Sequence, residues 1–270
     1  RGSTVTPPNT TVASMAYDSA RSRTVLLGDS SFGLVPTWEW DGINWTARPT
    51  FPSIPDITGA LAYDAARAVT VAFGNGDTWE WDGTDWSLRD WRRAPMSPTS
   101  TLNPVAYDSV RQRVVLLSSS RYGPETWEWD GAEWLLRSWG DGPTSGAITF
   151  DSLRARTVLI PGTNGNLVME WDGSTWSEHF GFPGPTQGNY PAIAYDSIRG
   201  VTVLYGGTLN LGDTWEWNGF SWSLRASTGP GRRANHAMAF DPTRGVTVLF
   251  GGFRSGALGD TWEWDGTVWT

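Results

Sequence analysis

Short apolar runs separated by turn residues recur along the chain, and the stretch 236–270 shows the pattern in full. Residues 236–240 alternate small and large side chains, and residues 246–250 form an apolar, β-branched run that ends at two glycines. Residues 260–264 alternate with period two, which places two Trp on one face of a strand and Glu263 on the other. An Asp-Gly hairpin signal and a further Trp follow. The pattern predicts four short antiparallel strands.

The same block returns six times. Each copy carries an aromatic-Asp-x-x-Arg segment, a Val/Leu-rich run, a Glu-Trp hairpin and a Trp that starts the last strand. The aromatic-Asp pairs recur every 43 to 46 residues, at Tyr17-Asp18, Tyr63-Asp64, Tyr107-Asp108, Phe150-Asp151, Tyr195-Asp196 and Phe240-Asp241. A fixed period of this length without helical segments is typical of propeller blades. We therefore predict an all-β, six-bladed propeller with four antiparallel strands per blade.

The repeats cover the whole chain, so we expect one domain, 1–270. The predicted blades are 11–48, 58–89, 102–137, 145–179, 190–225 and 235–270, the last joined by residues 1–6. The final blade stops at Trp269-Thr270, whereas the start of the chain reads like the segment that follows Arg225. We expect both chain ends to meet in blade six and close the ring. The alternative is a longer array cut at an arbitrary point.

The run Val-Leu-Phe-Gly-Gly at 248–252, followed by an aromatic strand and a Trp, resembles the Kelch repeat. The Gly-Gly pair is intact only at 206–207 and 251–252, and Trp stands where Kelch repeats often carry Tyr. The Trp-Asp-Gly-x-x-Trp hairpin is also similar to that of six-bladed fucose-binding lectins. In those lectins the glutamate sits three residues before the Trp, whereas here it directly precedes it. Both resemblances imply a propeller, and the second implies a sugar-binding role.

Composition narrows the choice of function. The net charge of −8 gives no broad attraction to nucleic acid, so we expect no nucleic-acid partner. Cysteine is absent, which removes disulfides, thiolate nucleophiles and Cys-based metal sites. No apolar stretch is long enough to span a membrane. The only histidines, His179 and His236, fall in different blades, so we expect no metal and no cofactor.

The first candidate site is the face formed by the loops between the second and third strands and by the connections between blades. These loops differ from blade to blade, whereas the Asp-x-x-Arg turns on the opposite face barely vary and are interpreted as scaffold. Aromatic and Arg side chains on loops of a rigid ring are typical of binding surfaces. Ligand-binding candidates on this loop face are Trp91, Arg92, Arg93, Arg121, Tyr122, Trp139, Arg232, Arg233, His236, Phe253 and Arg254. The alternative is that these side chains cap the blades and offset the negative charge.

The second candidate is a ring of glutamates, one per blade: Glu39, Glu80, Glu128, Glu170, Glu216 and Glu263. The hairpin register places each near the Arg of the fourth strand, which fits diagonal Glu–Arg pairing. These groups either form a structural ladder, which we favour, or line sugar pockets between blades. In blade four His179 replaces the Arg.

An enzyme is the third possibility. Sialidases are six-bladed and use an Arg cluster with a Tyr/Glu pair, which Tyr122 and Glu125 would supply here, but no second carboxylate is clearly placed. We assign no catalytic residue and treat a glycoside hydrolase or sialidase-like enzyme as an alternative. We expect a non-enzymatic recognition module for a glycan or protein ligand, monomeric or part of a longer chain, outside the cell or at its surface. Replacing Trp91, Arg92 and Arg93 together is expected to abolish binding with little loss of stability.

Overall fold

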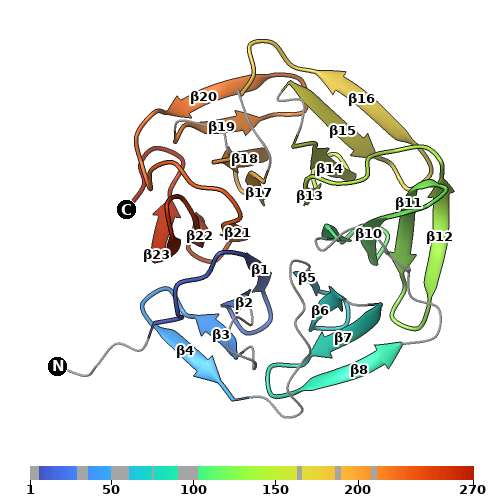
Figure 1. The fold of residues 1–270 in the computed structure, drawn as a ribbon, viewed down its shortest axis with the longest axis horizontal. Coiled ribbons are helices and arrows are strands. Elements are labelled where there is room, and N and C mark those ends of the chain that lie inside the picture. The colour runs from blue at the N-terminus through green and yellow to red at the C-terminus, as the bar shows by residue number, and fades with distance from the viewer. Residues whose placement is uncertain are drawn as a thin grey trace.

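The computed structural model describes residues 6–28, 36–49, 61–74, 76–90, 103–162, 166–185, 190–207 and 212–270. The described residues contain 23 strands and no helix, and they form six antiparallel sheets arranged around a central axis (Figure 1). The predicted six-bladed propeller is confirmed. Within each sheet the strands follow chain order from the axis outward.

The strands of the first three blades follow the predicted order. Blade one contains β1 (Ala13–Asp18), β2 (Arg23–Gly28), β3 (Thr37–Trp40) and β4 (Trp45–Arg48). Blade two contains β5 (Leu61–Asp64), β6 (Val69–Gly74), β7 (Asp77–Trp81) and β8 (Trp86–Asp90). Blade three contains β9 (Val105–Asp108), β10 (Arg113–Ser120), β11 (Gly123–Trp129) and β12 (Trp134–Trp139).

The other three blades repeat this order. Blade four contains β13 (Ala147–Asp151), β14 (Arg156–Ile160), β15 (Leu167–Trp171) and β16 (Trp176–Phe180). Blade five contains β17 (Ala192–Asp196), β18 (Val201–Tyr205), β19 (Thr214–Trp217) and β20 (Trp222–Ala226). Blade six contains β21 (Ala237–Asp241), β22 (Val246–Phe253) and β23 (Ala257–Trp264).

Blade six has three full strands, and Trp269-Thr270 starts a fourth one. Trp269 bridges to Trp264, and the backbones of Glu263 and Thr270 exchange two hydrogen bonds of 2.9 and 3.0 Å. At the other chain end, the Thr10 amide donates to the Leu258 carbonyl at 3.0 Å, so the N-terminal segment meets blade six. Residues 1–5, which we expect to complete the fourth strand, lie outside the described residues.

The second hairpin of blade six is longer than expected, because the strands do not stop at the glycine pair. Gly251 and Gly252 have φ values of +66° and +96°, and the register shifts between Phe250 and Gly252. Pairing then resumes between Phe253 and Ala257. Glycine permits this bulge at little steric cost, so the strand continues onto the loop face.

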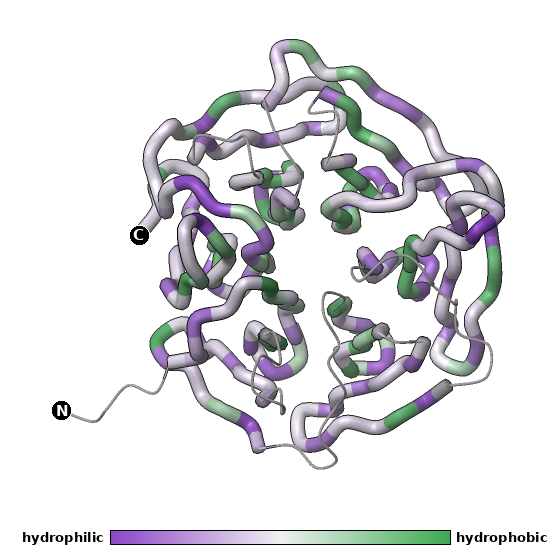
Figure 2. Tube along the Cα trace, viewed as in Figure 1, coloured by the Kyte–Doolittle hydropathy of each residue, from purple (hydrophilic) through white to green (hydrophobic). Residues whose placement is uncertain are grey.

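The core lies between the blades. Buried Val and Leu side chains of the second strands pack against the inner strands and the Trp residues of the next blade, as in the cluster that joins Val71 and Phe73 to Leu116, Trp129 and Trp134. Figure 2 shows hydrophobic residues on the inner strands, whereas hydrophilic and hydrophobic residues are mixed along the outer strands. Neighbouring blades therefore share their apolar surfaces.

Candidate functional site

The glutamate that recurs in every blade joins its own blade to the next one. Glu128 accepts from Nη1 of Arg111 on the first turn of its blade, and from Nε of Arg137 on β12 at 3.0 Å. It also accepts from Nε1 of Trp171 in blade four at 3.1 Å. Arg111 in turn donates Nε to Asp108 at 2.7 Å. We call this set of four side chains around one Glu a glutamate junction.

The Trp-to-Glu contact of this junction occurs at all six blade interfaces, including the one between blades six and one, where Trp40 donates to Glu263 at 3.0 Å. Among the described residues, Glu263 has Arg244 but no fourth-strand Arg. The Trp-to-Glu distances lie between 3.0 and 3.4 Å. In blade four His179 lies 3.5 Å from Glu170 in place of the Arg. Glu128 is 1% exposed. A sugar hydroxyl would reach such a carboxylate only if a junction opened, which supports the structural ladder over the interblade pocket.

The pKa values of the junction side chains agree with a network of ionised pairs. Burial raises the pKa of Glu39, but the hydrogen bonds and charges of Arg21 and Arg48 outweigh it and leave that pKa below its ordinary value. Burial likewise opposes the charge of Arg21, and Glu39 with Asp18 raises its pKa overall. The pair is ionised and mutually stabilised at neutral pH.

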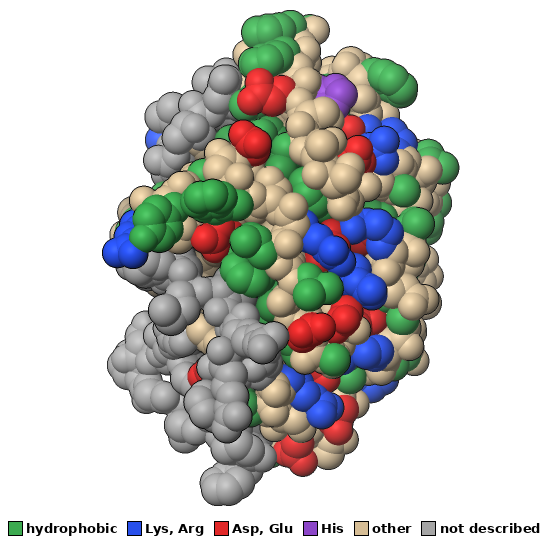
Figure 3. All heavy atoms as spheres, turned by 90° about the vertical axis from the view of Figure 1, so that its right-hand side faces the viewer, with side chains coloured by type: hydrophobic (Ala, Val, Ile, Leu, Met, Phe, Trp, Pro, Cys, Tyr) green, Lys and Arg blue, Asp and Glu red, His purple; other side chains and the backbone are tan. Residues whose placement is uncertain are grey.

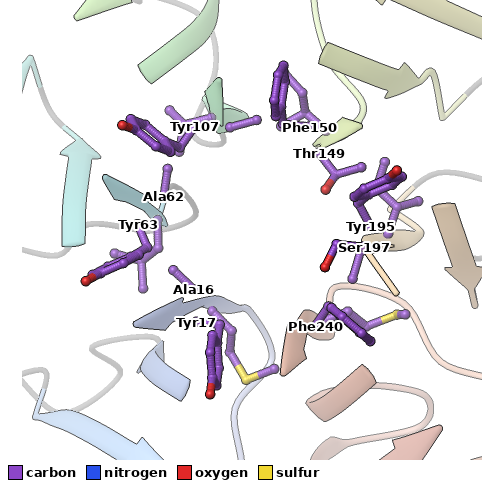
Figure 4. A pocket seen from close by; sticks show the side chains of 18 of the residues that line it. Ala16, Tyr17, Ala62, Tyr63, Tyr107, Thr149, Phe150, Tyr195, Ser197 and Phe240 are labelled. Carbon is purple, nitrogen blue, oxygen red and sulfur yellow. The ribbon is translucent and has the colours of Figure 1, made fainter. Parts of the chain in front are cut away.

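The axis of the ring contains a cavity of about 290 Å³, lined by the inner strands and their first turns. Tyr17, Tyr63, Tyr107 and Tyr195 point their hydroxyls away from this cavity (Figure 4). The Tyr63 hydroxyl instead accepts from the Ala20 amide of the preceding blade at 3.3 Å. The polar atoms of these Tyr residues therefore support blade packing and leave small and apolar groups toward the axis.

The structure places eight of the eleven loop-face candidates, because Trp91, Arg92 and Arg93 lie outside the described residues. The eight separate into two groups. Arg121, Tyr122 and Trp139 come together in blade three, whereas Arg232, Arg233, His236, Phe253 and Arg254 lie where blade five meets blade six.

The blade-three group is an exposed aromatic platform. Tyr122 and Trp139 are 61% and 60% exposed, and their ring centroids lie 6.4 Å apart in an edge-on arrangement. The Arg121 guanidinium lies over the Tyr122 ring, with Cζ 4.5 Å from the centroid, and also contacts its hydroxyl. In Figure 3 a projection with basic atoms at its tip and hydrophobic side chains behind it stands out at the left.

The platform rests on regular structure, because β10 and β11 pair as far as Ser120 and Gly123. Glu125, opposite Trp139 in the β11–β12 register, accepts from Nε1 of Trp127 at 2.9 Å and from the Ser118 hydroxyl at 3.1 Å. Tyr122 and Trp139 belong to none of the buried clusters between blades. The β10–β11 hairpin and the adjacent end of β12 therefore present two aromatic rings and one guanidinium to solvent.

The second group surrounds a hollow of about 450 Å³ lined by Gly207, Arg232, Arg233, Ala234, Phe253 and Arg254. Arg233 is 3% exposed and pairs with both carboxylate oxygens of Asp260 at 2.8 Å. Its other donors meet the carbonyls of Pro230, Gly231 and Gly251. All five N–H donors of the Arg233 guanidinium bind acceptors within the protein, so this side chain stabilises the loop. Arg232, Phe253 and Arg254 are exposed at the surface of the loop.

His236 lies under this loop and is 4% exposed. Its ring packs edge-on against Tyr205 at 5.8 Å between centroids and fills the space that glycine leaves at positions 206 and 252. Burial, reinforced by the charge of Arg233, lowers the pKa of His236 to about 3. The imidazole is therefore neutral near pH 7, and its role is packing against the neighbouring blade.

Two contributions were missed by sequence reasoning. Asp260 binds Arg233, and the first-turn arginines reach the glutamates as well as their own Asp residues. The period-two pattern of residues 260–264 placed Asp260 at the start of a strand, but nothing in the sequence indicated its partner 27 residues earlier.

Within the described ranges, no three His, Asp or Glu side chains gather as metal ligands. No helix in these ranges is long and apolar enough to cross a membrane.

No protein-family model matches the sequence, and no curated protein matches it. The Kelch likeness therefore remains a resemblance between sequence motifs. Solved structures do match the fold. The SapL1 lectin in complex with α-methyl fucoside has a TM-score of 0.63 at 14% identity, over 97% of this chain and 95% of that one.

An Aleuria aurantia lectin in complex with Fucα1-6GlcNAc has a TM-score of 0.62 at 14% identity, over 97% of this chain and 96% of that one. A GH74 enzyme from Niastella koreensis has a TM-score of 0.60 at 12% identity, over 95% of this chain and 46% of that one. At this level of identity the likeness concerns the fold: this chain shares the six-bladed propeller architecture of fucose-binding lectins.

Proposed function

We propose that the chain is a non-enzymatic module that recognises a glycan on its loop face. The observation that carries this function is the platform of Tyr122, Trp139 and Arg121. Its rings are exposed, held by the paired strands β10, β11 and β12, and unused in blade packing. Aromatic faces stack on the C–H surface of a sugar, and a neighbouring guanidinium can donate to its hydroxyls. The lectins that share the fold support a glycan as the ligand.

The interblade pocket is less favoured, because the described glutamates are engaged in junctions. A hydrolase is also less favoured. Glu125 and Asp260, two carboxylates toward the loop face, are each bound to the indole of the Trp two residues later, at 2.9 and 2.6 Å. Neither is placed as a free acid or base. A protein partner remains the alternative, since aromatic and Arg side chains suit both ligand classes.

A glycan array followed by titration calorimetry tests the proposal. Trp139→Ala and Tyr122→Ala are each expected to weaken binding of the best saccharide at least about tenfold, as expected for loss of an aromatic anchor. Phe220→Ala is the matched control, because Phe220 is 84% exposed on the opposite face, in the hairpin between β19 and β20. It should leave affinity unchanged.

Three results would count against this function. Saturable binding that is unaffected by both substitutions would move the site elsewhere. Absence of any saccharide ligand would favour a protein partner. Turnover of a chromogenic glycoside would favour an enzyme.

A further inference from the structure

We propose that the hollow between blades five and six binds an acidic sugar unit, one that carries a carboxylate or a sulfate ester; this rests on the proposed function and names the class of ligand. Arg232, Phe253 and Arg254 are the side chains that would contact it. They line the hollow from two different chain segments, the connection between β20 and β21 and the end of β22.

The floor of the hollow is held in place by its own hydrogen bonds. Arg233 ties the carbonyls of Pro230, Gly231 and Gly251 to Asp260. The Tyr205 hydroxyl donates to the Gly231 carbonyl at 3.0 Å. The backbone on both sides of position 232 is held by these hydrogen bonds before any ligand binds. Binding therefore does not have to order the loop, which lowers its cost in conformational entropy.

The two segments are also joined to one another. Ala234 and Phe253 exchange backbone hydrogen bonds of 3.0 and 2.8 Å, and the Gly207 amide donates to the Arg233 carbonyl at 2.9 Å. The close approach requires glycine at 252, where a Cβ would lie 2.7 Å from the Ala234 carbonyl oxygen. Phe253 and Arg254 therefore stand at a constant distance from the loop that carries Arg232.

The rim combines positive charge with an aromatic ring. Phe253 is 44% exposed. The Arg254 guanidinium extends toward the connection between β20 and β21. A Cβ on Gly231 of that connection would lie 3.5 Å from Nη1 of Arg254. Two carboxylates lie near the hollow: Asp260, which pairs with the buried Arg233, and Asp213, whose charge acts on Tyr205. Three guanidinium groups line the hollow, those of Arg232, Arg233 and Arg254. The charges around the hollow therefore sum to a positive value, and Arg254 presents its guanidinium at the surface.

The net charge of −8 does not cancel this local attraction. At physiological ionic strength, charges further away than about 8 Å are largely screened, so neighbouring side chains decide which ligand binds. A guanidinium matches a carboxylate or a sulfate with paired hydrogen bonds. The exposed phenyl ring offers an apolar surface to the sugar ring. An acidic saccharide satisfies both features, whereas a simple anion uses only one.

The experiment compares three oligosaccharides of equal length on the whole chain by titration calorimetry: a neutral one, an oligogalacturonide and a sulfated one. At least one acidic ligand is expected to bind about tenfold or more tightly than the neutral one, and Arg254→Gln is expected to remove that preference. Phe253→Ala should lower the affinity for the acidic ligand, but the acidic ligand should still bind more tightly than the neutral one. Arg113→Gln is the matched charge control and should leave the preference intact, because Arg113 lies at the start of β10 on the opposite face, where its guanidinium donates to the Gln112 carbonyl.

Melting curves of each variant confirm that the fold is kept. The proposal is overturned if no acidic ligand is preferred, if the preference survives Arg254→Gln, or if inorganic sulfate alone competes as well as the sulfated saccharide. Failure of this site leaves the neutral-glycan test of Trp139 and Tyr122 unaffected, so the two proposals are separable. The carboxylate and sulfate arms show which acidic group the hollow prefers.

Discussion

The indole N–H of the fourth-strand Trp donates to a Thr hydroxyl of the preceding blade at five of the six blade interfaces in the part of the chain that the structure describes. The distances are 2.7 to 2.8 Å. At the sixth interface blade four carries Val168 at the Thr position, and Nε1 of Trp222 is buried without a partner. A buried donor without an acceptor costs about 1–3 kcal/mol.

Val168→Thr is therefore expected to stabilise the protein by about 0.5–1 kcal/mol, because the new hydroxyl accepts from Trp222 while the side chain keeps its size. Urea unfolding of the variant and the parent measures the difference. The reverse change, Thr78→Val, removes the acceptor of Trp134 and should destabilise by about 1–3 kcal/mol. A loss of stability in Val168→Thr would mean that desolvation of the hydroxyl outweighs the gained hydrogen bond.

Among elements, the hairpin between the third and fourth strands is the one that docks on the preceding blade. In blade three the Asp130 carboxylate accepts from the amides of Ala132 and Glu133 at 2.8 and 2.9 Å, which closes the turn. Gly131 has φ +101° and faces the guanidinium of Arg67 from blade two, and a Cβ there would lie 2.9 Å from Nε. One glycine thus serves both the turn and the contact between blades.

Gly131→Ala should destabilise the protein by about 2–4 kcal/mol, of which about 1–2 kcal/mol is the cost of positive φ. Gly76→Ala isolates that backbone cost, because Gly76 has φ +85° and a Cβ at this position would meet no described atom within 4 Å. Chemical denaturation measures the unfolding free energy that each variant loses. The difference between the two losses is the contribution of the contact with Arg67. Equal losses in the two variants would show that the close packing against Arg67 is without energetic consequence.

For the whole molecule, ring closure is the property that remains to be tested. Glu263 is the junction glutamate of the blade that lacks a full fourth strand, and its side chain is 22% exposed, compared with 0–7% for the other five. The described N-terminal segment meets this blade at Thr10, whose amide donates to the Leu258 carbonyl at 3.0 Å.

Thr10→Pro removes that donor and is expected to lower the free energy of unfolding by about 1–3 kcal/mol, because the Leu258 carbonyl of blade six loses its partner. Urea unfolding of the variant and the parent measures the difference. An unchanged free energy of unfolding would show that this contact does not help to close the ring.

Much of the fold was readable from the sequence, because it depends on local patterns. The period of the aromatic-Asp pairs predicted six blades, and the alternation around Glu263 predicted its strand. The strand-four Arg beside four of the six glutamates also followed from hairpin register, as the pair Arg137 and Glu128 shows. These contacts join residues within one blade, where spacing along the chain sets distance.

The sites depended on contacts that spacing does not encode. Arg232, Arg233 and Arg254 are the same residue type in the sequence, yet Asp260 buries the charge of one and leaves the other two at the surface. Trp139 and Trp222 both lie on fourth strands, yet the Trp139 ring is 60% exposed at the end of β12 whereas Trp222 is buried between blades four and five. Periodicity and turn chemistry are local, so the repeating unit and its strands could be predicted from the residues alone. Burial depends on packing between segments distant in the chain. The folded molecule was therefore needed to show which polar and aromatic groups join the blades and which remain accessible to a ligand.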